Sequence, residues 1–391
     1  MQADGAATTP AVPVMREKTT GEMARKSALK GKSWLRCRPV GVGACAGQTT
    51  MNNEAFQTLV DTNDAWIAKR TGIRSRHVIQ EGSSLRQIAI ESALASLANS
   101  STKAADLDLV IVATSSPDDL FGDAASVASA IGASKAAAFD LTAACSGFVF
   151  GLVTASQFLH SGAYKKVMVI GADALTRFLD WNDRGTCILF GDGAGAIVLE
   201  ATDSIEESGL LGFALHSDGE RYPNLKLQFD SKYTQLGNTE KSVVDQGQYG
   251  KIGMNGPEVY KFAVNEVWKC ASVACTAVPA APLTPLSPTP LQVPEVINEA
   301  LANAGLHAGD VDWLLLHQAN IRIMEHAADV LGIPMDKVLI NLQEFGNTSA
   351  GSIPLALAEA VRTGKVKKGD IVAVAGFGAG LSWASAIIRW G

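Results

Sequence analysis

Short runs of aliphatic and β-branched residues alternate with longer segments of helical pattern through most of the chain, and this alternation restricts its possible folds more than any other feature. Because each short run has the length of a buried strand and each longer segment that of a helix, the pattern predicts a layered α/β fold. The predicted strands cover residues 107–114, 138–141, 166–171, 194–199, 312–316 and 371–375. The predicted helices follow Cys145 and begin near Pro257, Pro294, Ile321 and Ala350.

The chain divides into two halves that resemble each other loosely, at residues 39–205 and 206–391. Each half has a helix, a strand that ends at a turn of small residues, and a glycine-rich closing hairpin. Internal duplication is therefore a hypothesis, since one sequence alone does not demonstrate a repeat.

Two segments depart from this pattern. The first 40 residues contain eight Lys or Arg against three Asp or Glu and no apolar stretch, so residues 1–38 are interpreted as an organelle transit segment or a disordered tail. Residues 279–294 contain six of the chain's 14 prolines. Such density favours extended chain over helix, so we expect a surface insert at about residues 268–293, with a proline-recognition motif as the alternative.

Composition and charge exclude several classes of protein. With 391 residues, 47% of them hydrophobic, the chain has enough apolar side chains for one large domain or two fused half-domains. The net charge of −6 comes from well-mixed charges, which argues against nucleic-acid binding. No run approaches the roughly 20 apolar residues that cross a bilayer, so we expect no transmembrane helix. The six cysteines lie apart without C-x-x-C pairs, which argues for a reducing compartment and against a metal site.

The first candidate for chemistry is Cys145, which follows a predicted strand and a turn of small residues and precedes an apolar helix. A helix N-terminus favours a thiolate, so this placement predicts a thiol pKa below the usual value of about 8.5. The alternative is a small buried cysteine in a packed turn.

Two more segments carry polar groups in comparable places. His317 lies at the carboxyl end of a predicted strand, where α/β folds place catalytic groups, although a lone histidine there is more often a core residue. Asn347 follows a predicted strand and Gly346, ahead of a helix that we expect Thr348 or Ser349 to cap. Alone, Asn347 would be interpreted as a turn residue.

Three motifs occur in order along the chain: Cys145 after a predicted strand, His-Gln-Ala-Asn at 317–320 and Gly-Asn-Thr-Ser-Ala at 346–350. Together they resemble the motifs of β-ketoacyl-acyl-carrier-protein synthase III. This is the initiating condensing enzyme of dissociated fatty-acid synthesis and a member of the thiolase-like superfamily. The resemblance covers the chain from Val40 to Gly391 without the proline-rich segment. It implies a five-layer α-β-α-β-α fold of two duplicated halves.

The resemblance also implies a ping-pong reaction. Cys145 takes the acyl group of an acyl-CoA primer, usually acetyl-CoA, and malonyl-acyl-carrier protein then loses CO₂ and attacks the acyl-Cys. His317 and Asn347 stabilise the negative charge that decarboxylation places on the thioester oxygen. The backbone N–H groups of Cys145 and of Ala379, in the glycine-rich turn, serve as the oxyanion hole of the acyl transfer. Both thioesters are substrates, so no cofactor and no metal is implied.

Matching positions imply further roles. The residues expected to bind CoA or to close the substrate pocket are Trp66, Arg70, Arg184, Gly256, Asn320 and Phe121. The first three suit a purine with phosphates, and Gly256 and Asn320 line the pantetheine tunnel. Phe121 reaches across a dimer to close the partner's pocket, so the resemblance implies a homodimer.

Carrier-protein docking is expected at Arg322 and Lys261, but Asp329 and Val330 stand where bacterial relatives often have a pair of lysines. The N-terminal segment favours a plastid location, with the cytoplasm as the alternative. Three other functions stay open: a thiolase-like synthase of polyketide or branched-chain type with another primer or acceptor, a non-catalytic subunit that binds acyl-CoA or acyl-carrier protein, and a Cys-His-Asn hydrolase.

Overall fold

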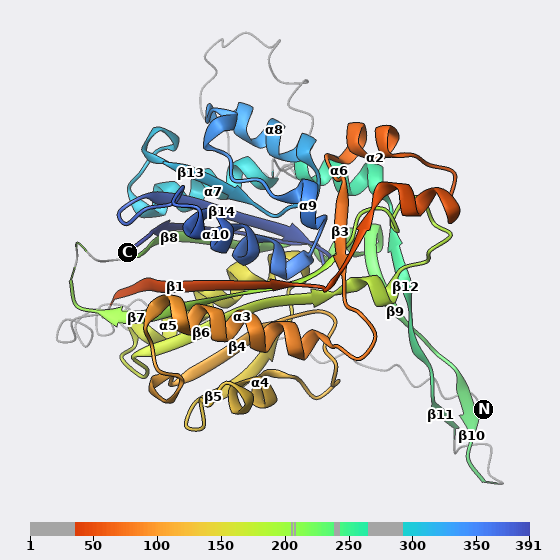
Figure 1. The fold of residues 1–391 in the computed structure, drawn as a ribbon, viewed down its shortest axis with the longest axis horizontal. Helices are drawn as coiled ribbons and strands as arrows, with labels where there is room; N and C mark the ends of the chain where they lie inside the picture. Colours follow the sequence, from red (N-terminus) through yellow and green to blue (C-terminus); the bar gives the residue numbers. More distant parts are fainter. Residues whose placement is uncertain (1–35, 205, 207–208, 238–242, 265–291) are drawn as a thin grey trace, which may run out of the picture. The chain divides into compact units, whose positions relative to one another are not determined.

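Two β-sheets form the centre of the fold (Figure 1). The structure is a computed structural model and describes residues 36–204, 206, 209–237, 243–264 and 292–391. The first sheet has the strand order β1 (Arg36–Ala46), β7 (Asp192–Thr202), β6 (Lys166–Ala174), β4 (Leu109–Ala113), β5 (Ala137–Leu141). The second has the order β13 (Trp313–Leu316), β14 (Ile371–Gly378), β15 (Ser382–Arg389), β8 (Leu210–Ser217). In the first sheet β4 runs parallel to both β5 and β6. In the second sheet β13 runs parallel to β14.

Helices cover both faces of each sheet, because the strands are apolar on both sides. The two helices α5 (Gly147–His160) and α10 (Ser352–Arg362) share one core with residues of both sheets, so they lie between them. The helices α3 (Leu85–Ser100) and α4 (Ala124–Ala130) pack on the other face of the first sheet. The helices α7 (Gln292–Ala304) and α8 (Ile321–Leu331) pack on the other face of the second. The predicted five-layer α-β-α-β-α architecture is confirmed.

Side-chain alternation along single strands explains the layering. In β4, Val110 and Val112 join the core beneath α3 and α4, whereas Leu109 and Ile111 join the core around α5 and α10. In β13, Leu315 faces the central helices, whereas its neighbours on both sides face α7 and α8. Successive residues of a strand point to opposite faces, so each apolar run supplies two cores at once.

Smaller elements surround the sheets. The hairpin β2 (Thr49–Asn52) and β3 (Ser75–Val78) encloses α2 (Asp64–Thr71). The strand β9 (Leu225–Asp230) pairs with β12 (Gln248–Met254), and β10 (Tyr233–Gln235) pairs with β11 (Val243–Asp245). The short helices are α6 (Gly256–Val264) and α9 (Leu342–Phe345). In the described part of the chain no helix is long and apolar enough to span a membrane.

All predicted strands and helices except one strand are present, with differences at their ends. The helix predicted from Pro294 begins at Gln292, because proline is tolerated in a first turn, where the N–H has no helical partner. The strand predicted ahead of Gly346 is wrong, since α9 occupies that place. Residues 1–35 of the transit-like segment and nearly all of the proline-rich segment lie outside the described residues, whereas Arg36–Arg38 already belong to β1. The duplication hypothesis stays a prediction.

Candidate active site

Cys145 lies in a tight turn at the N-terminal end of α5. The 3-10 turn Ala144–Ser146 leads directly into that helix, and Ala144 has the left-handed φ of 47°. A second 3-10 turn, Ser349–Gly351, leads into α10 in the same way, with Ser349 at φ 50°. Left-handed backbone is unfavourable for residues other than glycine, so two strained turns face each other at the starts of the two central helices.

The glycine-rich turn approaches the backbone of Cys145. It joins β14 to β15, as predicted, with Gly378 opposite Ser382. A Cβ on Gly378 would lie 2.6 Å from the backbone N of Cys145, so only glycine fits there. This close approach is the reason we expected for the glycines, and it brings the Ala379 peptide next to the turn that carries the thiol.

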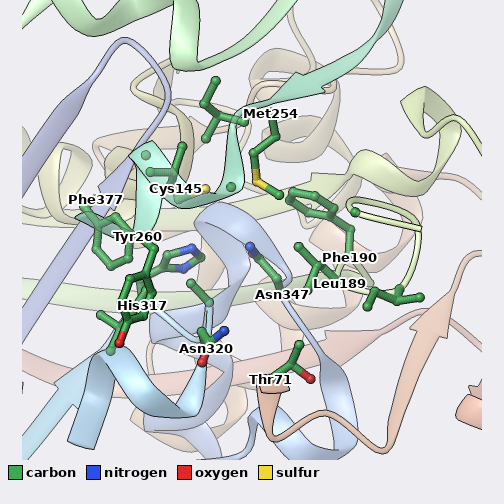
Figure 2. A pocket seen from close by; sticks show the side chains of 18 of the residues that line it. Thr71, Cys145, Leu189, Phe190, Met254, Tyr260, His317, Asn320, Asn347 and Phe377 are labelled. Carbon is green, nitrogen blue, oxygen red and sulfur yellow. The ribbon is translucent and has the colours of Figure 1, made fainter. Parts of the chain in front are cut away.

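His317 follows β13 at the carboxyl end of the strand, and its backbone N–H donates to the Ala375 carbonyl at 2.8 Å. Its side chain is only 2% exposed. The imidazole packs edge-on against Phe377, with 5.4 Å between ring centroids. Figure 2 shows this ring pointing into the pocket that Cys145 also lines.

Asn347 follows α9 and is held by its backbone and by its side-chain oxygen. Its N–H donates to the Leu189 carbonyl at 2.9 Å, and its Oδ1 accepts from the Ser349 N–H at 2.9 Å. With Oδ1 engaged in that way, the Nδ2 group is left as a donor toward the pocket, where Figure 2 shows it.

One pocket of about 270 Å³ unites most of the predicted site. Its wall is largely apolar, with Phe190, Met254 and Phe377 among the lining side chains. The predicted residues that line it are Cys145, His317, Asn347, Trp66, Arg70, Arg184, Gly256 and Asn320. Residues from both halves of the sequence therefore meet around one thiol.

Burial controls the protonation of the two titratable groups in this pocket. Removal from water raises the pKa of Cys145 to about 12, and a hydrogen bond from Ser349 opposes this shift. The prediction of a lowered thiol pKa was wrong, because desolvation outweighs the stabilisation that the turn supplies. Burial also lowers the pKa of His317 to about 3, so its imidazole is neutral. The resting site therefore combines a neutral thiol with a neutral imidazole that offers one N–H donor.

At the wall formed by α2, two guanidinium groups lie over the indole ring of Trp66. The Arg70 and Arg184 groups lie 4.2 Å and 4.7 Å from the indole centroid. Arg184 also donates to the Asp61 carbonyl at 2.7 Å. Asn320 caps α8 by accepting from a backbone N–H and donates to the Arg70 carbonyl at 3.1 Å, which ties α8 to α2.

The remaining predicted residues lie away from this pocket. Phe121 is fully exposed and, with Ala379, lines a second cavity of about 920 Å³ that also reaches Cys145. Arg322 donates to the Lys69 carbonyl at 3.1 Å, and Lys261 pairs with Glu258 at 2.7 Å. Neither docking residue is among those that line the two cavities.

Sequence reasoning missed two residues next to the thiol. The Ser349 hydroxyl donates to the Cys145 sulfur at 3.3 Å, although the sequence was taken to place a helix cap there. That cap is wrong, because α10 begins at Ser352 and neither Thr348 nor Ser349 caps it. Asp173 is fully buried in β6 behind the same turn, and a lone acidic residue within an apolar strand was the signal that could have revealed it.

Comparisons with known proteins agree with the motifs. A family model described as 3-oxoacyl-[acyl-carrier-protein] synthase III matches residues 139–219, and its C-terminal counterpart matches residues 301–390. A β-ketoacyl-[acyl-carrier-protein] synthase III of Microcystis aeruginosa is 49% identical over 351 residues, covering 90% of this chain and 96% of the relative.

Solved structures share the whole fold. The crystal structure of 3-oxoacyl-[acyl-carrier-protein] synthase III from Aquifex aeolicus superposes with a TM-score of 0.75 at 35% identity, covering 90% of this chain and 100% of that one. The priming β-ketosynthase of a polyketide biosynthetic pathway superposes with a TM-score of 0.77 at 30% identity, covering 91% of this chain and 97% of that one.

Proposed function

Because the chain belongs to the β-ketoacyl-[acyl-carrier-protein] synthase III family, we propose that it condenses an acyl-CoA primer with malonyl-acyl-carrier protein to start fatty-acid synthesis. The primer we propose is acetyl-CoA, and the product is a 3-oxoacyl thioester of the carrier protein. The observation that carries the proposal is the convergence of the Cys145 thiol, the His317 imidazole and the Asn347 amide on one buried pocket.

In the first half-reaction, Cys145 is the nucleophile. Its sulfur forms a bond to the acyl carbon, the bond from that carbon to the CoA sulfur breaks, and the proton of the thiol leaves with CoA. The backbone N–H groups of Cys145 and Ala379 would stabilise the tetrahedral oxyanion, which the close approach of Gly378 to Cys145 supports. The position of the thiol at the start of α5 helps the transient thiolate that performs the attack.

In the second half-reaction, His317 and Asn347 act on the malonyl thioester. Loss of CO₂ leaves an enolate oxygen, and the N–H donors of both side chains stabilise its charge. The carbanion then attacks the acyl-Cys, and the Cys145 sulfur leaves as the bond to the acyl group breaks. Burial keeps the His317 imidazole neutral, and a neutral imidazole retains one N–H donor for this role.

The wall beside the thiol suits CoA. The Trp66 indole and the two guanidinium groups beside it, those of Arg70 and Arg184, offer flat surface for a purine and positive charge for its phosphates. Gly256 and Asn320 line the same pocket and leave a passage for the pantetheine arm. CoA and the carrier protein bring the reacting groups, so we propose no bound cofactor.

We further propose a homodimer, in which the exposed Phe121 of one protomer closes the second cavity of its partner. Arg322 and Lys261 would dock the acidic carrier protein by exchanging their present partners for its carboxylates. Residues 1–38 would direct the chain to a plastid, which a fusion of that segment to a fluorescent protein tests directly.

Mass spectrometry of the intact protein after mixing with a panel of acyl-CoAs tests the reaction and the primer together. We expect a mass increase of one acetyl group, its absence in Cys145→Ser, and slower transfer from longer or branched primers. Retained labelling of Cys145→Ser would refute the nucleophile. The similarity to a polyketide priming synthase favours a second candidate, a synthase with a larger primer, which preferential labelling by a longer acyl-CoA would identify.

A further inference from the structure

Arg76, in β3, has one of the largest fully buried side chains of the described residues, although it does not line the pocket around Cys145. Its guanidinium donates to Asn53 Oδ1 at 2.8 Å, to the Met51 carbonyl at 3.3 Å and to the Ile188 carbonyl. All three acceptors are neutral, and no carboxylate in the described part of the chain pairs with this charge. A buried cation without a counterion is costly, so its presence points to a role other than stability.

The orientation of this guanidinium is fixed from one side. Its central carbon lies 4.4 Å from the centroid of the Phe56 ring, and its Nη1 makes the bond to Asn53. Asn53 is held in turn, because its Nδ2 donates to Asp64 Oδ1 at 2.9 Å. The planar group therefore has one orientation, in which the remaining nitrogen Nη2 of Arg76 meets the Ile188 carbonyl.

The carbonyl that Arg76 holds belongs to the segment that fixes the backbone of Asn347. The Asn347 N–H donates to the Leu189 carbonyl at 2.9 Å, and the Gly191 N–H donates to the Asn347 carbonyl at 3.0 Å. Both backbone groups of Asn347 are thus bonded to a segment that begins directly after Ile188. The direction of the Asn347 side chain depends on where this segment lies.

The stem of Arg76 also packs against both sides of this contact. A Cβ on Gly191 would lie 3.1 Å from the Arg76 Cβ, and a Cβ on Gly346 would lie 3.2 Å from it. Gly346 directly precedes Asn347 and has a positive φ of 64°. The two segments that meet at Asn347 therefore both rest on one side chain, and its loss would leave space behind each of them.

We propose that Arg76 is a positioning residue, which holds the segment after Ile188 against Asn347 so that the Asn347 amide points at the malonyl thioester oxygen. Arg76 touches no substrate and acts only through the backbone bonds between these segments. The inference rests on the proposed role of Asn347 as a donor to the enolate.

The CoA wall of the pocket does not depend on Arg76. The turn that carries Arg184 is closed by Asp183, whose Oδ1 accepts from the Gly185 N–H at 2.8 Å and whose Oδ2 accepts from the Thr186 hydroxyl at 2.7 Å. The loss of Arg76 should therefore impair decarboxylation and spare acyl transfer from acetyl-CoA. A residue that served stability alone would affect both half-reactions equally.

The test compares the two half-reactions in the full chain, with ¹⁴CO₂ release from labelled malonyl-acyl-carrier protein and acetyl-enzyme formation from acetyl-CoA. We expect Arg76→Met to lower CO₂ release at least about tenfold, because a small misplacement of a catalytic group costs up to about 10²-fold. Acetyl transfer should change less than about twofold. Ile88→Val, which shortens a fully buried side chain in the core beneath α3, is the control for lost stability and should leave both rates within about twofold.

A double substitution separates positioning from stability. Because Arg76 acts through Asn347 in this proposal, Arg76→Met should lower CO₂ release less than about twofold further in a chain that already carries Asn347→Ala. Arg76→Lys is a second single variant with a milder change, since its ammonium keeps the charge and a donor for the Ile188 carbonyl. It should give a loss of CO₂ release between those of Arg76→Met and the wild type.

Three outcomes would overturn the proposal: loss of both half-reactions by the same factor in the two Arg76 variants, unchanged CO₂ release in both, or an additive effect in the double variant. A wild-type chain that neither takes an acetyl group nor releases CO₂ would instead refute the proposed function, and with it the premise of this inference.

Discussion

Asn347 has two hydrogen-bonding groups with separate tasks, and two substitutions separate them. Its Oδ1 accepts from the Ser349 N–H at 2.9 Å, while its Nδ2 faces the pocket. Asn347→Ala removes both groups. Asn347→Asp keeps the acceptor and places a second oxygen, with negative charge, where the donor was. Both variants therefore lose the Nδ2 donor, and only Asn347→Asp keeps an acceptor for the Ser349 N–H.

The expected magnitude follows from the donor alone. One side-chain donor to a developing oxyanion is worth about 2.7 to 4 kcal/mol, so Asn347→Ala should slow malonyl decarboxylation about 10² to 10³-fold. Asn347→Asp should slow it at least as much, because its carboxylate repels the enolate. Acyl transfer from acetyl-CoA uses the backbone N–H groups in the mechanism we propose, so Asn347→Asp should retain it within severalfold.

Release of ¹⁴CO₂ from labelled malonyl-acyl-carrier protein reports the first quantity, and the mass of the acetyl-enzyme reports the second. Asn341→Ala is the matched control, since Asn341 is also a buried amide, 3% exposed, but its Nδ2 donates to Glu359 outside the pocket. Equal loss of both half-reactions in Asn347→Asp would refute the division of roles. Decarboxylation that survives in Asn347→Ala would refute the donor.

Three further substitutions test other parts of the structure. Gly378→Ala places a Cβ 2.6 Å from the Cys145 backbone N, so the turn must shift, and the variant should lower the rate of acyl transfer at least tenfold, measured by acetyl-enzyme formation. Arg76→Met removes a fully buried guanidinium that donates to Asn53 Oδ1 at 2.8 Å, and it should cost about 1 to 3 kcal/mol in urea unfolding, because a buried acceptor is left unpaired. His317 has a folded-state pKa near 3 against an ordinary 6.5, so the unfolded chain binds more protons between these values and stability falls as pH falls through that range. His317→Gln should remove up to about 1.4 kcal/mol per pH unit of that slope, and an unchanged acid-unfolding profile would contradict the buried neutral imidazole.

The layers could be predicted because they depend on short-range pattern, whereas the three central side chains were assigned through the resemblance of their ordered motifs to a known family. Apolar runs with small-residue turns mark the strands, and polar residues directly after such runs fall at the carboxyl ends where the pocket forms, as His317 shows. The start of the helix near Pro294 and the strand expected ahead of Gly346 were less accurate. Proline fits a first helical turn as well as the end of an extended segment, and residues 342–345 form only a single turn of helix.

The protonation of Cys145 could not be predicted in the same way. Its local sequence places it at a helix start, which argues for a thiolate, but the pKa is set by side chains that bury it from elements far along the chain. Gly378, Ser349 and Asp173 all approach the sulfur only after the two central helices pack between the sheets. Sequence motifs therefore locate the proposed nucleophile, whereas its reactivity depends on the tertiary packing of the second half against the first.

That dependence explains why the two strained turns belong together. The thiol must stay neutral and protected at rest and become a strong nucleophile only while a thioester lies in the pocket. Burial raises the pKa of Cys145 and keeps the resting thiol neutral, whereas the Ser349 hydroxyl, which donates to its sulfur at 3.3 Å, lowers that pKa and supports the thiolate. If Ser349→Ala acylated at the wild-type rate, the hydroxyl would not assist the thiolate, and the burial of Cys145 would have to be overcome by the substrate itself.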